Sequence, residues 1–163
     1  MKLPMSFDEM KEKALDKGLC HDWVIILKNA QCAEDIPEDQ ISIAAMWWAT
    51  HIGDKDLMRP LVTDPEYAYL WARYIGDEDI MRPLIAKSEW AYKWAKNIGD
   101  KDLMRPKITN SYWAYIWARN MGDHDIMRPN VTDPEWVYRW VKNIGDRDIM
   151  RPLLKGTQHE DKI

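Results

Sequence analysis

A unit of 23 residues recurs five times in this chain without a gap, and this repeat constrains the fold more than any other feature. The copies begin at Trp48, Trp71, Trp94, Trp117 and Trp140, and each carries the motif Gly-Asp-x-Asp-(Leu/Ile)-Met-Arg-Pro. A unit this short cannot bury an apolar face alone, so successive units must stack on one another. The sequence therefore predicts a solenoid over residues 48–154.

Each unit is expected to hold one helix of about 12 residues and one short helical turn. Tyr67, Trp71 and Ile75 follow the spacing i, i+4, i+8 of a helical stripe, and alanines beside them allow close helix packing. In the short turn, Ile80 and Met81 are the expected buried side. A strand over this aromatic segment is the alternative, which the helical spacing opposes. The fold prediction is all-α, a right-handed superhelical α-solenoid.

The helix starts have recognisable signals. Thr63 with Glu66, and Thr132 with Glu135, fit the capping box. Asp77, directly after a glycine, is expected to cap the short helix with its carboxylate.

The ends of the chain depart from the repeat. Residues 1–47 are predicted to form an N-terminal helical cap, with helices starting after Ser6 and over residues 22–30. The segment 155–163 is predicted to be a flexible polar tail.

The repeated Trp and Met positions are the candidate core. Two interpretations of the indoles are open: a stacked core, which their place on the alanine stripe favours, or an exposed platform for bases or sugars. The candidate core residues are Trp48, Trp71, Trp94, Trp117, Trp140, Met58, Met81, Met104, Met127 and Met150.

The repeated acids and arginines are open to two interpretations as well. They are either catalytic or anion-binding groups, or a ladder in which an arginine such as Arg82 pairs with an aspartate of the next unit. Recurrence in identical surroundings favours the ladder, since an active site needs one asymmetric constellation. The ladder residues are Asp77, Asp79, Arg82, Asp100, Asp102, Arg105, Asp123, Asp125 and Arg128.

A tyrosine followed four positions later by a cation recurs on the helix side expected to face away from the tryptophans. This strip is the candidate surface for binding a partner, and an ordinary solvated helix face is the equally open alternative. Its residues are Tyr69, Arg73, Tyr92, Lys96, Tyr115, Arg119, Tyr138 and Lys142.

Composition excludes several classes of protein. The formal charge of −4 argues against binding polyanions by net charge alone, and no apolar run is long enough for a membrane span. Two cysteines are too few for a secreted disulfide framework, which favours the cytoplasm. No metal or other cofactor is expected, because Cys20, Cys32, His21, His51, His124 and His159 share no ligand spacing.

The 23-residue unit of a helix and a shorter turn resembles the leucine-rich-variant repeats and, more loosely, HEAT or armadillo units. The resemblance is architectural and covers residues 48–154; the motif residues differ from the leucine pattern of that family.

The leading functional hypothesis is a tryptophan-rich, non-enzymatic scaffold that binds another protein as an adaptor or as a stoichiometric inhibitor, with a mobile element as one candidate source. The alternative is a nucleic-acid or nucleotide binder that uses the Tyr–Arg/Lys strip. An enzyme with a site in residues 1–46 and a self-assembling stack are the remaining hypotheses.

Overall fold

The computed structural model describes residues 7–17 and 35–162. Within these ranges the regular elements are all helices, which confirms the all-α prediction. The chain divides into two compact units, residues 1–85 and 86–163. The helix predicted over 22–30, with Cys20, His21 and Cys32, lies outside the described residues.

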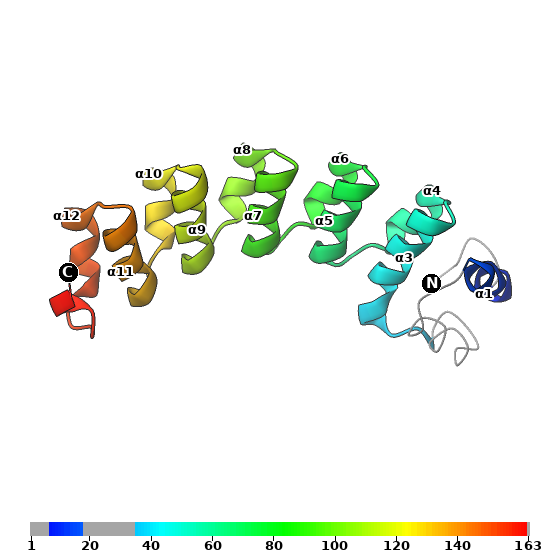
Figure 1. The fold of residues 1–163 in the computed structure, drawn as a ribbon, viewed down its shortest axis with the longest axis horizontal. Coiled ribbons are helices and arrows are strands. Elements are labelled where there is room, and N and C mark those ends of the chain that lie inside the picture. The colour runs from blue at the N-terminus through cyan, green and yellow to red at the C-terminus, as the bar shows by residue number, and fades with distance from the viewer. Residues whose placement is uncertain (1–6, 18–34, 163) are drawn as a thin grey trace. The chain divides into compact units, whose positions relative to one another are not determined.

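The first unit holds a separate helix and two repeats of a long helix, a one-turn helix and a 3₁₀ turn (Figure 1). Its elements are α1 (Phe7–Asp16), α3 (Glu38–His51), α4 (Lys55–Met58), η2 (Arg59–Leu61), α5 (Pro65–Tyr74), α6 (Glu78–Met81) and η3 (Arg82–Leu84). The predicted boundary at residue 47 falls inside α3, because a register that starts at each tryptophan divides every long helix.

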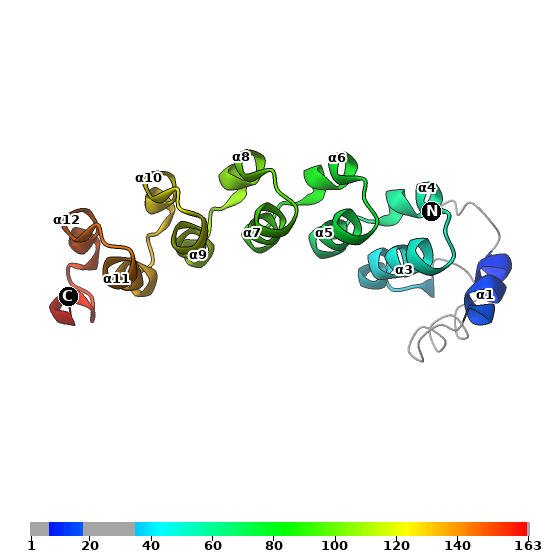
Figure 2. The same ribbon diagram turned by 45° about the horizontal axis from the view of Figure 1, so that its top comes forward.

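The second unit holds three such repeats and a terminal turn. Its elements are α7 (Ser88–Asn97), α8 (Lys101–Met104), η4 (Arg105–Lys107), α9 (Ser111–Met121), α10 (His124–Met127), η5 (Arg128–Asn130), α11 (Pro134–Asn143), α12 (Arg147–Met150), η6 (Arg151–Leu154) and η7 (Glu160–Lys162). The long helices α7, α9 and α11 pack in sequence, and the short helices form a second row beside them (Figure 2).

The core of each repeat is the tryptophan and methionine set predicted from the sequence. All five tryptophans of the set are at most 4% exposed and all five methionines at most 1%. Alanines of the long helices, such as Ala91 and Ala114, are fully buried beside them and let the helices approach closely. The indoles therefore do not form an exposed platform.

The predicted capping boxes are wrong by one residue. Asp64 and Asp133, not the preceding threonines, occupy the N-cap, and their carboxylates accept from the backbone N–H two residues later at 2.7 and 2.9 Å. The reason is that Pro65 and Pro134 occupy the first helical position, which leaves the residue just before each proline at the cap. Asn110 caps α9 in the same way.

The one-turn helices expose a side chain that the sequence analysis expected to be buried. Met81 is 1% exposed, but Ile80 is 51% exposed. A single turn can direct only one of two adjacent side chains inward, and methionine takes that place. The same alternation exposes Leu57, Leu103, Ile126 and Ile149.

The segment predicted to be a flexible polar tail forms turns over residues 155–162 and packs against α11 through His159. His159 is 6% exposed, and its ring stacks on Tyr138 with 4.9 Å between centroids. Its Nε2 lies 3.3 Å from a carboxylate oxygen of Glu135. The turn over residues 155–162 thus covers the side of α11 that carries Tyr138.

Candidate functional site

The predicted partner-binding strip is only half exposed. Tyr69, Tyr92 and Tyr115 are 3, 6 and 2% exposed, which corrects the expectation that they face solvent, and only Tyr138 is partly accessible. The cations four residues later, Arg73, Lys96, Arg119 and Lys142, are all exposed. The strip is therefore a row of cations with its tyrosines turned into the helix interface.

The buried phenol groups link the helices. The hydroxyl of Tyr92 accepts a hydrogen bond from Nδ2 of Asn120 at 2.8 Å, and that of Tyr115 accepts one from Nδ2 of Asn143 at 2.9 Å. Both bonds join a long helix to the next one 28 residues later. Their role is to fix neighbouring repeats in register, since a buried hydroxyl is costly without a partner.

Aromatic rings of a different row reach the surface instead. Trp90, Trp113 and Trp136, one turn before the core tryptophans, are partly exposed. The ring of Tyr112 lies between Trp113 and Trp136, with 4.7 Å between centroids on each side. We call Lys96, Arg119 and Lys142, together with Trp90, Trp113 and Trp136, the cation–aromatic face of the second unit.

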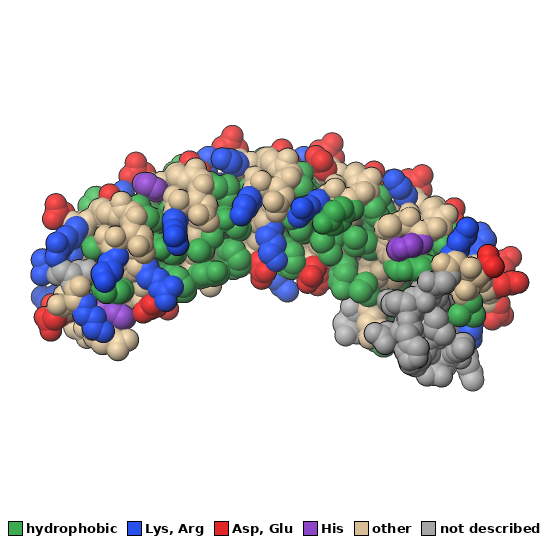
Figure 3. Space-filling view, viewed as in Figure 1, with side chains coloured by type: hydrophobic (Ala, Val, Ile, Leu, Met, Phe, Trp, Pro, Cys, Tyr) green, Lys and Arg blue, Asp and Glu red, His purple; other side chains and the backbone are tan. Residues whose placement is uncertain are grey.

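On this face the two glutamates are paired with cations, whereas the three recurring cations are not paired with carboxylates. Glu89 is held by Lys93 at 2.7 Å, and Glu135 by Arg139 at 2.7 Å. Lys96, Arg119 and Lys142 have no carboxylate partner among the described residues. Over α9 and α11, Lys and Arg side chains lie beside hydrophobic ones on the visible surface (Figure 3). Lys96 and Lys142 lie over the rings of Tyr92 and Tyr138, at 5.9 and 4.9 Å from the centroids, whereas the cations over Trp90 and Trp136 are Lys93 and Arg139.

The acids and arginines of the repeat form a second cluster. Oδ2 of Asp123 accepts hydrogen bonds from Nε of Arg105, 18 residues earlier, at 3.1 Å and from Nε1 of Trp117 at 3.0 Å. Asp77 with Arg59 and Trp71, and Asp146 with Arg128 and Trp140, repeat this geometry. The arginine pairs expected between consecutive repeats are therefore present within both units.

The carboxylate that follows each glycine is not a helix cap, which corrects the expectation for Asp77. Asp77 has φ 63° and ψ 36°, and its side chain makes no capping hydrogen bond. Gly122 before Asp123 has φ 88° and ψ −138°, a region open only to glycine. This turn aims the carboxylate back at the indole and at the arginine of the preceding repeat.

The second acid of the motif faces solvent. Asp79 pairs with Arg82 at 2.9 Å, and Asp102 and Asp125 pair likewise with Arg105 and Arg128, but these three carboxylates are about nine-tenths exposed. Exposed ion pairs contribute little free energy. The ladder therefore depends on the aspartates that directly follow the glycine of each repeat, which we call the inner aspartates.

Hydrogen bonding holds the pKa of Asp77, Asp123 and Asp146 below its usual value. The indole N–H is the largest cause for Asp77 and Asp123, and the Arg128 guanidinium for Asp146, while desolvation opposes the shift. These contacts stabilise the ionised carboxylate and tie up its lone pairs. They give the inner aspartates a structural explanation that needs no substrate.

The lowered pKa values predict a loss of stability in acid. Because the folded pKa lies below the unfolded one, the stabilisation is complete above the unfolded pKa, near 4, and is lost as the pH falls through the folded pKa. Asp123→Asn should thus be less stable than the wild type at pH 7, and this gap should narrow as the pH falls below about 4. Urea midpoints measured across this pH range test the prediction, which a constant gap would contradict.

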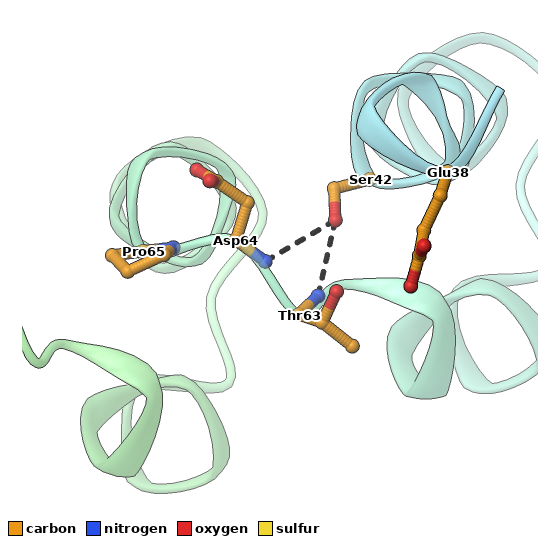
Figure 4. A pocket seen from close by; sticks show the side chains of 5 residues that line it. All are labelled: Glu38, Ser42, Thr63, Asp64 and Pro65. Atoms are coloured by element: carbon orange, nitrogen blue, oxygen red, sulfur yellow. Dashed lines mark hydrogen bonds between the residues drawn. The ribbon is translucent and has the colours of Figure 1, made fainter.

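A polar depression lies in the first unit, lined by Glu38, Ser42, Thr63, Asp64 and Pro65 (Figure 4). Oγ of Ser42 accepts from the backbone N–H of Thr63 at 3.1 Å and of Asp64 at 3.3 Å. Ser42 thereby joins α3 to the next repeat, and its lone pairs are occupied. Ser88 and Ser111 make equivalent bonds, a clasp between repeats that the sequence analysis did not identify.

The described residues contain no group of three or more His, Cys, Asp or Glu side chains arranged to hold a metal ion. His51 stacks on Trp47, and His124 lies 3.1 Å from the carbonyl oxygen of Ala118. None of the helices in the described ranges combines the length and apolar character required to span a bilayer.

Comparison of the chain with protein families, with curated proteins and with solved structures finds no match.

Proposed function

We propose that the chain is a non-enzymatic, right-handed α-solenoid of five 23-residue repeats that binds another protein in the cytoplasm as an adaptor or stoichiometric inhibitor. The recurrence of equivalent long helices from residues 65, 88, 111 and 134 supports the repeat. The architecture leaves the exposed sides of these helices as a regular surface of the kind that repeat scaffolds use for recognition.

The cation–aromatic face carries the proposal. Lys96, Arg119 and Lys142 recur at the same helix position in three successive repeats, and no carboxylate of the described chain neutralises them. Partly exposed indoles on the same helices supply apolar area, the combination found at the energetic centres of protein interfaces. The partner that fits is an extended acidic segment with interspersed apolar side chains.

An acidic protein segment fits this face better than a nucleic acid does. The cations stand one per 23-residue repeat, whereas nucleic-acid binding draws on a dense line of cations that matches the phosphates. A cation of the same helix already covers one face of the Trp90 ring, Lys93 at 3.7 Å, and of the Trp136 ring, Arg139 at 4.6 Å, which leaves only one face of each ring for stacking on a base.

A charge-reversal experiment tests the proposal. A fluorescently labelled peptide that alternates Glu with Leu should bind the full chain, and the triple variant K96E/R119E/K142E should weaken binding at least about tenfold, since like charges across an interface cost several kcal/mol. Fluorescence anisotropy at fixed ionic strength measures the affinity.

The matched control is K55E/K101E/R147E, which reverses three exposed cations at the first position of the short helices. A glutamate, Glu78, stands at this position in another copy, so the fold tolerates it. The control should bind the peptide within about twofold of the wild type, apart from screened long-range effects. Equal loss in both triples, or tighter binding of a single-stranded oligonucleotide with a steep salt dependence, would overturn the proposal.

A further inference from the structure

Asp77, Asp123 and Asp146 each have both donors of the ladder, but the first and the last repeat of the chain each lack one half of the set. In the interior, an inner aspartate such as Asp123 has two donors, an indole of its own repeat and an arginine 18 residues earlier. In the first repeat of the chain the aspartate is present and the arginine is missing, and in the last repeat the arginine is present and the aspartate is missing. The residue that each end lacks is therefore the one that the other end offers.

The first repeat has the acceptor and lacks the arginine. Asp54 has the backbone conformation of the other inner aspartates, φ 53° and ψ 39°, but Ile36 stands 18 residues before it. Its side chain is exposed and does not reach Trp48, whose Nε1 is buried without a hydrogen-bond partner among the described residues. A buried N–H without an acceptor costs about 1–3 kcal/mol.

The last repeat has the arginine and lacks the acceptor. Arg151 follows the fifth Met of the motif, as Arg128 follows the fourth, but it is exposed and makes no ion pair with any described residue. The turn over residues 155–162 covers α11 and leaves this arginine at the surface. Leu153 beside it is 50% exposed, and Leu57 near Asp54 is 41% exposed.

We infer that a second copy of this chain closes the ladder: Arg151 of one molecule pairs with Asp54 of the next and draws that carboxylate onto Nε1 of Trp48. The charge of the two units favours this contact, because residues 1–85 hold 16 acidic and 9 basic residues and residues 86–163 hold 11 acidic and 14 basic ones. The contact is heterologous, so it propagates head to tail. It is independent of the proposed function, since it uses neither the long-helix cations nor their rings.

Charge reversal at each end tests the contact. The mass of the full chain, followed by sedimentation velocity from micromolar to millimolar concentration, should rise with concentration and fall with added salt. D54R or R151D alone should weaken self-association at least about tenfold, because like charges then face each other. D54N, which keeps the left-handed backbone available to Asn and removes only the charge, should weaken it as well.

An equimolar mixture of D54R and R151D should associate again. In the mixture, the unchanged Arg151 of the D54R variant meets the unchanged Asp54 of the R151D variant, and the two substituted side chains also carry opposite charges. A merely misfolded variant cannot be rescued in this way. The indole N–H resonance of Trp48 in a ¹H–¹⁵N spectrum should move with concentration in the wild type and stay fixed in either variant alone.

The controls E78R and K101E change charge at exposed short-helix positions away from the two ends and should associate as the wild type does. The inference is overturned if the wild type stays monomeric over the whole range, if the single variants associate like the controls, or if the mixture remains monomeric. None of these results bears on peptide binding by the cation–aromatic face, so the two proposals fail separately.

Discussion

Replacing Trp117 with alanine should lower the free energy of unfolding by about 3–5 kcal/mol, the range for truncating a large buried aromatic side chain. The indole is fully buried between repeats, and its Nε1 donates to Asp123 at 3.0 Å. The substitution removes both the packed ring and the donor that holds the ladder. Urea denaturation followed by far-ultraviolet circular dichroism measures the change.

Two further variants separate the contributions of the ring. Trp117→Phe keeps an aromatic ring but loses the N–H and part of the indole volume, so it should cost less than Trp117→Ala, about 1–3 kcal/mol. Tyr74→Ala truncates an aromatic residue that is 64% exposed and should cost no more than about 0.5 kcal/mol. A similar loss in Trp117→Ala and Tyr74→Ala would show that the tryptophan row is not the core of the repeat.

Replacing Asp123 with alanine should cost about 2–4 kcal/mol. The indole N–H of Trp117 loses its acceptor inside the protein, a penalty of about 1–3 kcal/mol, and alanine at φ 58° adds about 1 kcal/mol of backbone strain. Asp123→Asn should cost less, because asparagine accepts the same hydrogen bond and tolerates the left-handed conformation. Thermal and urea unfolding measure both variants.

Asp125 provides the control for this experiment within the same repeat. Its carboxylate also pairs with an arginine, Arg128 at 2.8 Å, but it is about nine-tenths exposed. Asp125→Ala should therefore cost no more than about 0.5 kcal/mol. Equal costs for Asp123→Ala and Asp125→Ala would mean that the ladder stabilises the fold only through charge, not through the buried indole.

The candidate site illustrates how far a repeat pattern predicts a surface. The tyrosine–cation spacing identified the exposed cations Lys96, Arg119 and Lys142 correctly. It misplaced Tyr92 and Tyr115, because the interface between long helices is wide enough to cover a residue two positions before each core tryptophan. A signal was present in Asn120 and Asn143, which repeat 28 residues after these tyrosines and donate to their hydroxyls.

By itself, the sequence determined where the long helices lie, that tryptophan and methionine form the core, and that arginine pairs with an aspartate of the next repeat. Those features follow from periodicity, since residues on one helical stripe share one environment in every copy. Only the tertiary structure decided that Asp77 turns from its helix toward Trp71, that Ile80 faces solvent and that the ladder stays open at Asp54 and Arg151. The exposure of Ile80 follows from a single turn that buries only Met81. The turn of Asp77 and the open ends of the ladder depend on contacts between repeats, such as that of Arg59 with Asp77 18 residues later, which lie beyond the range of any local pattern.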